Sequence, residues 1–154
     1  ALFWSALLSP SLAIDDYELA QAQRVLAGKV HDVAGESGIF SGHWGWQHHL
    51  EELKWTPIEE DRPLESGSYY ARSLNGWPQD GVFSCLEHRG TWSVRDRWPG
   101  PRVHTQSGHG NFHAYMIADG PTWSIVPWSF GDDPHDVAHL FFVCDGSGAL
   151  LQGQ

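Results

Sequence analysis

The densest group of side chains able to do chemistry lies at residues 41–49, with the sequence SGHWGWQHH. The group follows a short apolar run typical of a buried strand and opens a helical segment, a position where α/β folds bind ligands and free backbone N–H groups favour anions. His43 and Gln47 are one helical turn apart and can converge on one ligand group. The predicted ligand-binding residues are His43, Trp44, Trp46 and Gln47. The alternative is a tight structural turn in which glycines supply backbone freedom and tryptophans pack.

A second group of imidazoles offers an alternative of a different kind. His109 and His113 have the i, i+4 spacing that binds metal on a helix. The flanking glycines favour a loop, and the alternation after His113 favours a strand, which spreads the two rings apart. We therefore expect no metal site and no cofactor, with His109 and His113 as the alternative metal ligands.

The remaining acidic and nucleophilic groups form no recognisable catalytic pattern. The acidic residues at 132–136 lack the spacing of a calcium loop and are interpreted as a solvated turn. No serine lies in a GxSxG motif, and the two cysteines lack zinc-site spacing. Cys85 and Cys144 are either free thiols or a disulfide. The disulfide requires that the strand starting at Val82 and the terminal strand at Leu140 lie side by side.

The elements that position these groups alternate between helix and strand. A helix is expected at 15–30, a strand at 39–42, a helix at 46–53 and a strand at 54–58, which together give a parallel βαβ unit. Later strands are expected at 67–74, 82–88, 91–98, 113–118 and 140–144, with an extended segment at 123–128. The segments 82–88 and 91–98 flank Arg89-Gly90 as a hairpin. The predicted fold is α/β, with a small mixed sheet, a βαβ unit near the N-terminus and antiparallel strands toward the C-terminus.

The first residues form an apolar run that stops at Asp15-Asp16. Residues 1–13 are too few to span a bilayer, which takes about 20 residues. The segment 1–14 is typical of the exit end of a transmembrane helix or the back half of a signal peptide, and an ordinary buried helix is the remaining alternative. If residues 1–14 end a transmembrane helix or a signal peptide, residues 15–148 form a single soluble domain outside the cytoplasm, followed by a tail at 149–154.

Length and charge limit the partners of this domain. The 154 residues fit one ordinary domain. Nine basic residues against 19 acidic ones give a net charge of −10, and no basic cluster offsets it, so nucleic acid is not an expected partner. The nine tryptophans fit either a core or a surface that stacks on sugars.

Three segments resemble one family of enzymes. Residues 42–50, GHWGWQHHL, resemble the segment GHWGFQYY(M/L) of bacterial membrane glycosyltransferases of the dolichyl-phosphate-mannose-protein mannosyltransferase type, in the GT-C class. Residues 14–24 resemble the segment that follows the last transmembrane helix in those proteins, and residues 126–143 resemble their ending. The chain departs from the pattern at His48-His49, where the family has an aromatic pair, and residues 75–111 have no counterpart.

The resemblance implies a C-terminal, extracytoplasmic domain that packs over the transmembrane part of its parent chain. The parent would transfer sugar from a polyprenyl-phosphate donor to an acceptor, with its catalytic carboxylate in an early loop and its donor site among transmembrane helices. No catalytic residue is therefore expected here, and the chain alone should not transfer sugar. Two alternatives remain: a secreted or periplasmic carbohydrate-binding module, and a small metal-dependent hydrolase built on the histidines.

Overall fold

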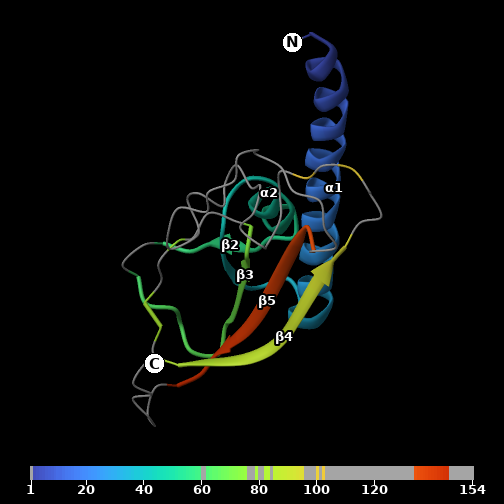
Figure 1. The fold of residues 1–154 in the computed structure, drawn as a ribbon. Helices are drawn as coiled ribbons and strands as arrows, with labels where there is room; N and C mark the ends of the chain where they lie inside the picture. The colour runs from blue at the N-terminus through green and yellow to red at the C-terminus, as the bar shows by residue number, and fades with distance from the viewer. Residues whose placement is uncertain are drawn as a thin grey trace, which may run out of the picture.

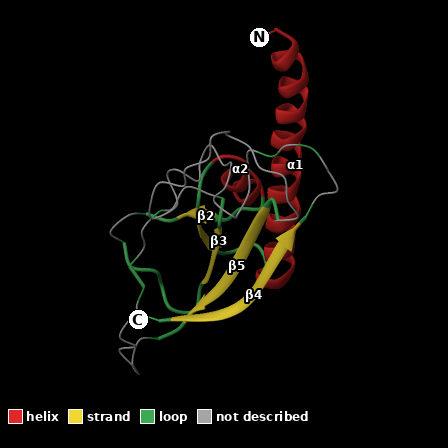
Figure 2. Cartoon of the chain, in the orientation of Figure 1, coloured by secondary structure: helices red, strands yellow, loops and turns green. Residues whose placement is uncertain are grey.

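The computed structural model describes residues 2–59, 62–75, 79, 82–83, 85–95, 100, 102 and 134–145, with side chains described from residue 9 onward. Two helices and five strands follow one another along these ranges (Figures 1 and 2). They are α1 (Leu2–Ala34), β1 (Ile39–Ser41), α2 (Trp44–Glu52), β2 (Thr56–Pro57), β3 (Tyr69–Ser73), β4 (Leu86–Val94) and β5 (Asp136–Val143). The strands form one sheet in the order β2-β1-β3-β5-β4, and both helices pack on the same face of it.

The sheet is mixed, and this confirms the predicted fold class. β1 pairs in parallel with β2 and with β3, while β5 pairs antiparallel with both β3 and β4. The strand, helix and strand β1-α2-β2 form the expected βαβ unit, with β2 shorter than predicted. The carboxyl ends of β1 and β3 therefore lie at one edge of the sheet, beside the start of β5. We call this side of the sheet, where the strands β1 and β3 end, the carboxyl edge.

The helix α1 is twice as long as the predicted helix at 15–30, because the apolar run at 2–13 continues it without a break. Its second half packs on the sheet through Ala22, Leu26 and Val30, which recur at helical spacing and are fully or almost fully buried. The helix ends at Ala34 and is followed by Gly35, whose φ of +80° is typical of the residue after a helix. The first turns project beyond the sheet (Figure 1). No helix in the described part of the chain is long and apolar enough to cross a membrane.

The predicted hairpin at 82–98 is wrong. β4 is one continuous strand that pairs with β5 from Leu86 to Val94, with a register shift between His88 and Gly90. The extra residue is absorbed as a bulge. Gly90 is a site of close packing, because a Cβ there would lie 2.5 Å from the Trp92 ring. Arg89-Gly90 therefore has the composition of a turn but lies inside a strand.

The cysteines confirm the expected neighbourhood of the last two strands. Cys85 and Cys144 flank β4 and β5 and form a disulfide, with their Cα atoms 5.2 Å apart. The backbone N–H of Cys144 also donates to the carbonyl of Cys85 at 3.2 Å. The predicted segments at 113–118 and 123–128 lie outside the described residues, as do His109 and His113.

Candidate functional site

The turn between β1 and α2 forces the chain through two positive φ angles. Gly42 has a φ of +118° and Trp44 a φ of +61°. A bulky residue in this region costs on the order of 1–3 kcal/mol and is found where the surroundings impose it, often at functional sites. Trp44 nevertheless remains 51% exposed. Folding alone would favour glycine or asparagine at this position, so the exposed indole is a candidate for contact with a ligand.

His43 and Gln47 come together as the sequence predicted. His43 is the N-cap residue of α2 and is extended, but its side chain makes no capping hydrogen bond; its Nδ1 lies 3.2 Å from Gln47 Oε1. Gln47 Nε2 donates to Glu51 Oε1 at 2.7 Å, which turns the amide oxygen toward His43. The Nδ1 of a neutral His43 must then carry the proton, and its Nε2 is the acceptor. The Gly42 N–H donates to Gln79 Oε1 at 2.9 Å, so this backbone donor of the turn already has a partner.

Trp46 differs from the other predicted ligand contacts. Its side chain is fully buried in the core that α1, α2 and the sheet share. Its Nε1 donates to the Ser41 carbonyl at 3.1 Å, which satisfies the only polar atom of the indole. Packing accounts for Trp46, whereas His43, Trp44 and Gln47 lie at or near the surface of the turn.

The sequence reasoning missed a group of buried polar side chains at the same carboxyl edge, which we call the edge cluster. Its members come from α1, from the end of β3 and from the start of β5: Asp15, Gln23, Ser73, Asn75, His135 and Asp136. Asp136 is at its centre. Asp136 Oδ1 accepts from the backbone N–H groups of Asn75 and Val137 at 3.1 and 2.7 Å, and Oδ2 accepts from Ser73 Oγ at 2.5 Å. Burial raises the pKa of Asp136 above its usual value, and the hydrogen bonds lower it in part.

The interpretation of residues 132–136 as a solvated acidic turn is wrong for His135 and Asp136, two of the three residues of this segment that the structure describes. His135 and Asp136 are fully buried, and His135 Nδ1 lies 3.6 Å from Asp15 Oδ1. The signal was present in the period of the strand. Asp136 has the same parity as Ala138 and Leu140, which face the helices and are fully buried.

The edge cluster supports the turn directly. A Cβ at position 45 would lie 2.5 Å from Gln23 Oε1, so the first residues of α2 rest against Gln23. The Gln23 side chain in turn hydrogen-bonds Asp136. Ser73 Oγ donates to the Asp136 carboxylate and so joins β3 to β5 within the cluster. The cluster therefore fixes the geometry of the turn, and the accessible part of the site is the exposed Trp44 with the half-buried His43 and Gln47.

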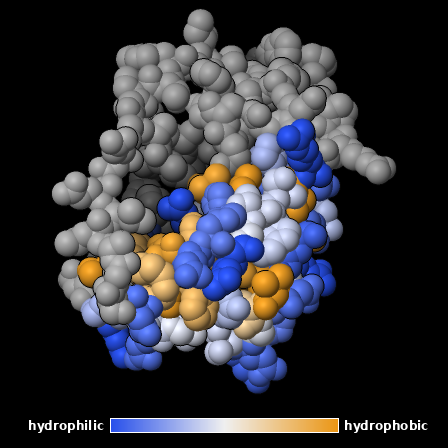
Figure 3. All heavy atoms as spheres, turned by 90° about the horizontal axis from the view of Figure 1, so that it is seen from below, coloured by the Kyte–Doolittle hydropathy of each residue, from blue (hydrophilic) through white to orange (hydrophobic). Residues whose placement is uncertain are grey.

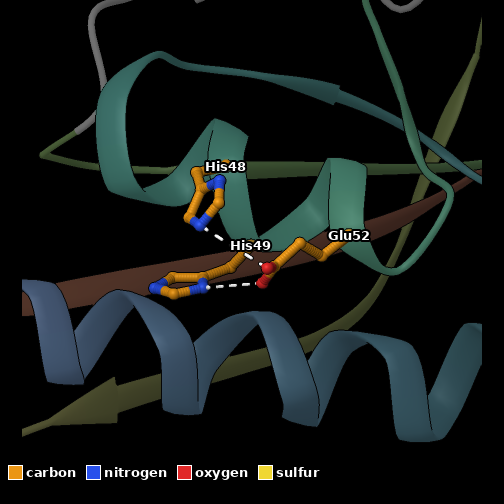
Figure 4. Close-up of side chains that lie close together, drawn as sticks. All are labelled: His48, His49 and Glu52. Atoms are coloured by element: carbon orange, nitrogen blue, oxygen red, sulfur yellow. Dashed lines mark ion pairs between the residues drawn. The ribbon is translucent and has the colours of Figure 1, made fainter.

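Two further features lie away from the turn. A cavity of about 190 Å³ beside β2 is lined in part by Thr56, Pro57 and Arg62, and the Arg62 guanidinium already pairs with neighbouring glutamates. A group of three metal-ligand side chains, His48, His49 and Glu52, lies further along α2 (Figure 4).

Comparison with models of protein families, with curated proteins and with solved structures found no match to this chain.

Proposed function

We propose that this chain is an extracytoplasmic domain held at a membrane surface, with the turn between β1 and α2 facing the membrane, in a glycosyltransferase that uses a polyprenyl-phosphate sugar donor. The observation that carries the proposal is the direction of α1 relative to the sheet. The motif at residues 42–50, which resembles the membrane glycosyltransferases, lies on that same side.

The helix α1 runs from the carboxyl edge of the sheet to the opposite edge. Asp15 lies beside His135 at the carboxyl edge, and Gly35 lies at the other end, where its carbonyl accepts from Trp55 Nε1 at 3.0 Å. The apolar residues 2–13 therefore extend past the carboxyl edge, away from the sheet (Figure 1). A membrane that buries these N-terminal turns of α1 would also face His43 and Trp44.

Exposed hydrophobic side chains support this orientation. Among the exposed hydrophobic side chains, Ile14, Tyr17 and Trp44 are 37%, 61% and 51% exposed. Ile14 and Tyr17 flank Asp15, which lies at the carboxyl edge, and Trp44 opens α2 directly after β1. Tyrosine and tryptophan are the side chains enriched where a membrane meets water. The opposite end, seen from below in Figure 3, mixes hydrophilic and hydrophobic surface, as expected for a face in water.

The chemistry of the turn favours a sugar as its contact. An exposed indole offers an apolar face to a pyranose ring, and the imidazole and amide of His43 and Gln47 bond hydroxyl groups. The turn would then recognise the sugar of the donor or acceptor, while the transfer chemistry belongs to the transmembrane part of the parent.

The disulfide supports an oxidising compartment, because such bonds persist outside the cytoplasm. A secreted or periplasmic carbohydrate-binding module is the second candidate, favoured by the exposed Trp44. The two functions differ in one property: only the first requires that the N-terminal turns of α1 bind a membrane.

Co-flotation of the chain with phospholipid vesicles tests that property. We expect the chain to float with the vesicles. A variant carrying both Phe3→Glu and Leu7→Glu should lose binding by more than tenfold, since a large apolar side chain that enters the membrane contributes about 1.5–3 kcal/mol. The matched control is Val25→Glu, an exposed α1 position that lies alongside the sheet, which should float like the parent. A parent chain that stays in solution, yet binds oligosaccharide through Trp44, would favour the carbohydrate-binding module.

A further inference from the structure

We propose that His48, His49 and Glu52 of α2 form a binding site for a divalent transition metal, with Zn²⁺ as the matching ion. The three side chains project from consecutive turns of the helix and converge (Figure 4). These residues differ from His109 and His113, the alternative metal ligands in the sequence. The site on α2 is independent of the proposed function, since it stands on other atoms.

The spacing of the ligand atoms carries the proposal. His48 Nε2 lies 3.6 Å from Glu52 Oε1, and His49 Nδ1 lies 3.5 Å from Glu52 Oε2. Zinc binds imidazole nitrogen and carboxylate oxygen at about 2.0–2.2 Å, which separates neighbouring tetrahedral ligands by roughly 3.3–3.5 Å. Both separations are near this value and too long for strong hydrogen bonds. Glu52 thus faces each imidazole, through a different carboxylate oxygen, at about the distance that an ion between them would set.

Small side-chain adjustments suffice to close the site. All three ligand atoms lie within 4.8 Å of one another. The rings of His48 and His49 are 5.2 Å apart between centroids, and His48 is 66% exposed, so its ring can rotate toward the ion at little cost. His49 is 20% exposed and provides the more rigid ligand.

The donor set selects the metal. Two imidazole nitrogens and one carboxylate suit zinc and its transition-metal neighbours, whereas calcium and magnesium require oxygen ligands. The net charge of −10 raises the local concentration of cations. Three protein ligands leave at least one coordination position for water. A bound metal would link residues one helical turn apart and so stabilise α2, the helix that follows the turn at His43 and Trp44.

Isothermal titration of the tag-free chain with ZnCl₂ at neutral pH tests the site. We expect one zinc per chain, with affinity reduced at least tenfold in Glu52→Gln and in His48→Gln. Both side chains are more than 60% exposed, so these variants should fold as the parent does. The matched control is Glu51→Gln, the neighbouring exposed carboxylate on the same helix, which should bind zinc with unchanged affinity.

Cobalt gives an independent measurement of the same site. Co²⁺ bound by His48, His49 and Glu52 should give visible absorption bands that zinc removes, magnesium leaves intact and acid abolishes, because protons compete for the ring nitrogens. The proposal is overturned if the parent chain binds no zinc. It is equally overturned if Glu52→Gln and His48→Gln bind zinc as tightly as the parent, since the metal would then lie on other histidines.

Discussion

Replacement of Asp136 by alanine should destabilise the fold strongly, because the carboxylate is the common acceptor of the edge cluster. Alanine removes the partner of Ser73 Oγ, of two backbone N–H groups and of the Gln23 amide. A buried donor without a partner costs about 1–3 kcal/mol. The Asn75 N–H also reaches Ser73 Oγ at 3.2 Å and keeps part of its bonding. We therefore expect a loss of about 3–5 kcal/mol in the free energy of unfolding, the usual cost of breaking a buried polar network.

Asp136→Asn is the matched variant, because it keeps the shape and removes the charge. Its amide oxygen can accept from both backbone N–H groups, and its amide nitrogen can donate to Ser73 Oγ. The pKa of Asp136 is raised from 3.8 by burial, so the folded protein binds this proton more tightly than the unfolded chain. The stabilising contribution of the carboxyl is therefore complete below pH 3.8 and is lost as pH rises through the folded pKa. Asp136→Asn, which does not titrate, should gain stability relative to the parent over that rise.

Urea unfolding followed by tryptophan fluorescence, with the disulfide intact, measures both effects between pH 4 and pH 8. The reasoning is refuted if Asp136→Ala unfolds within about 1 kcal/mol of the parent, a loss typical of any substitution. It is also refuted if the stability of Asp136→Asn relative to the parent stays flat or falls as pH rises.

Three further predictions concern the frame of the site. Replacing both Cys85 and Cys144 by serine removes a disulfide that joins residues 59 positions apart, and should lower the free energy of unfolding in urea by about 4 kcal/mol. A loss below about 1 kcal/mol would contradict a stabilising role for this cross-link. Gly45→Ala should cost about 1–3 kcal/mol through overpacking, whereas the control Gly28→Ala, with open space at its Cβ, should gain about 0.5–1 kcal/mol in thermal melts. Trp44→Gly should raise stability by about 1 kcal/mol by relieving the positive φ, while weakening vesicle or sugar binding; a destabilised variant would mean that the indole serves the core.

The sequence predicts the parts of this fold that depend on local pattern. The apolar run before Gly42 and the helical spacing after it are sufficient for the βαβ unit, and they locate the turn that brings His43 to Gln47. Arg89-Gly90 fails as a turn prediction because the bulge depends on the Trp92 ring and on pairing with β5, which are not local. Asp136 fails for a related reason: its partner Ser73 is 63 residues away, and an acidic stretch is ordinarily solvated.

The central claim is that the turn between β1 and α2 serves sugar transfer at the membrane and is not required for folding. The direct measurement is transfer from a polyprenyl-phosphate sugar by the intact protein in its native membranes, compared between the parent and His43→Ala. We predict that His43→Ala lowers transfer at least tenfold, while the free energy of unfolding of the present chain changes by no more than about 0.5 kcal/mol, as for a surface substitution. A His43→Ala protein that transfers sugar as fast as the parent, or one that melts far earlier, would contradict the claim.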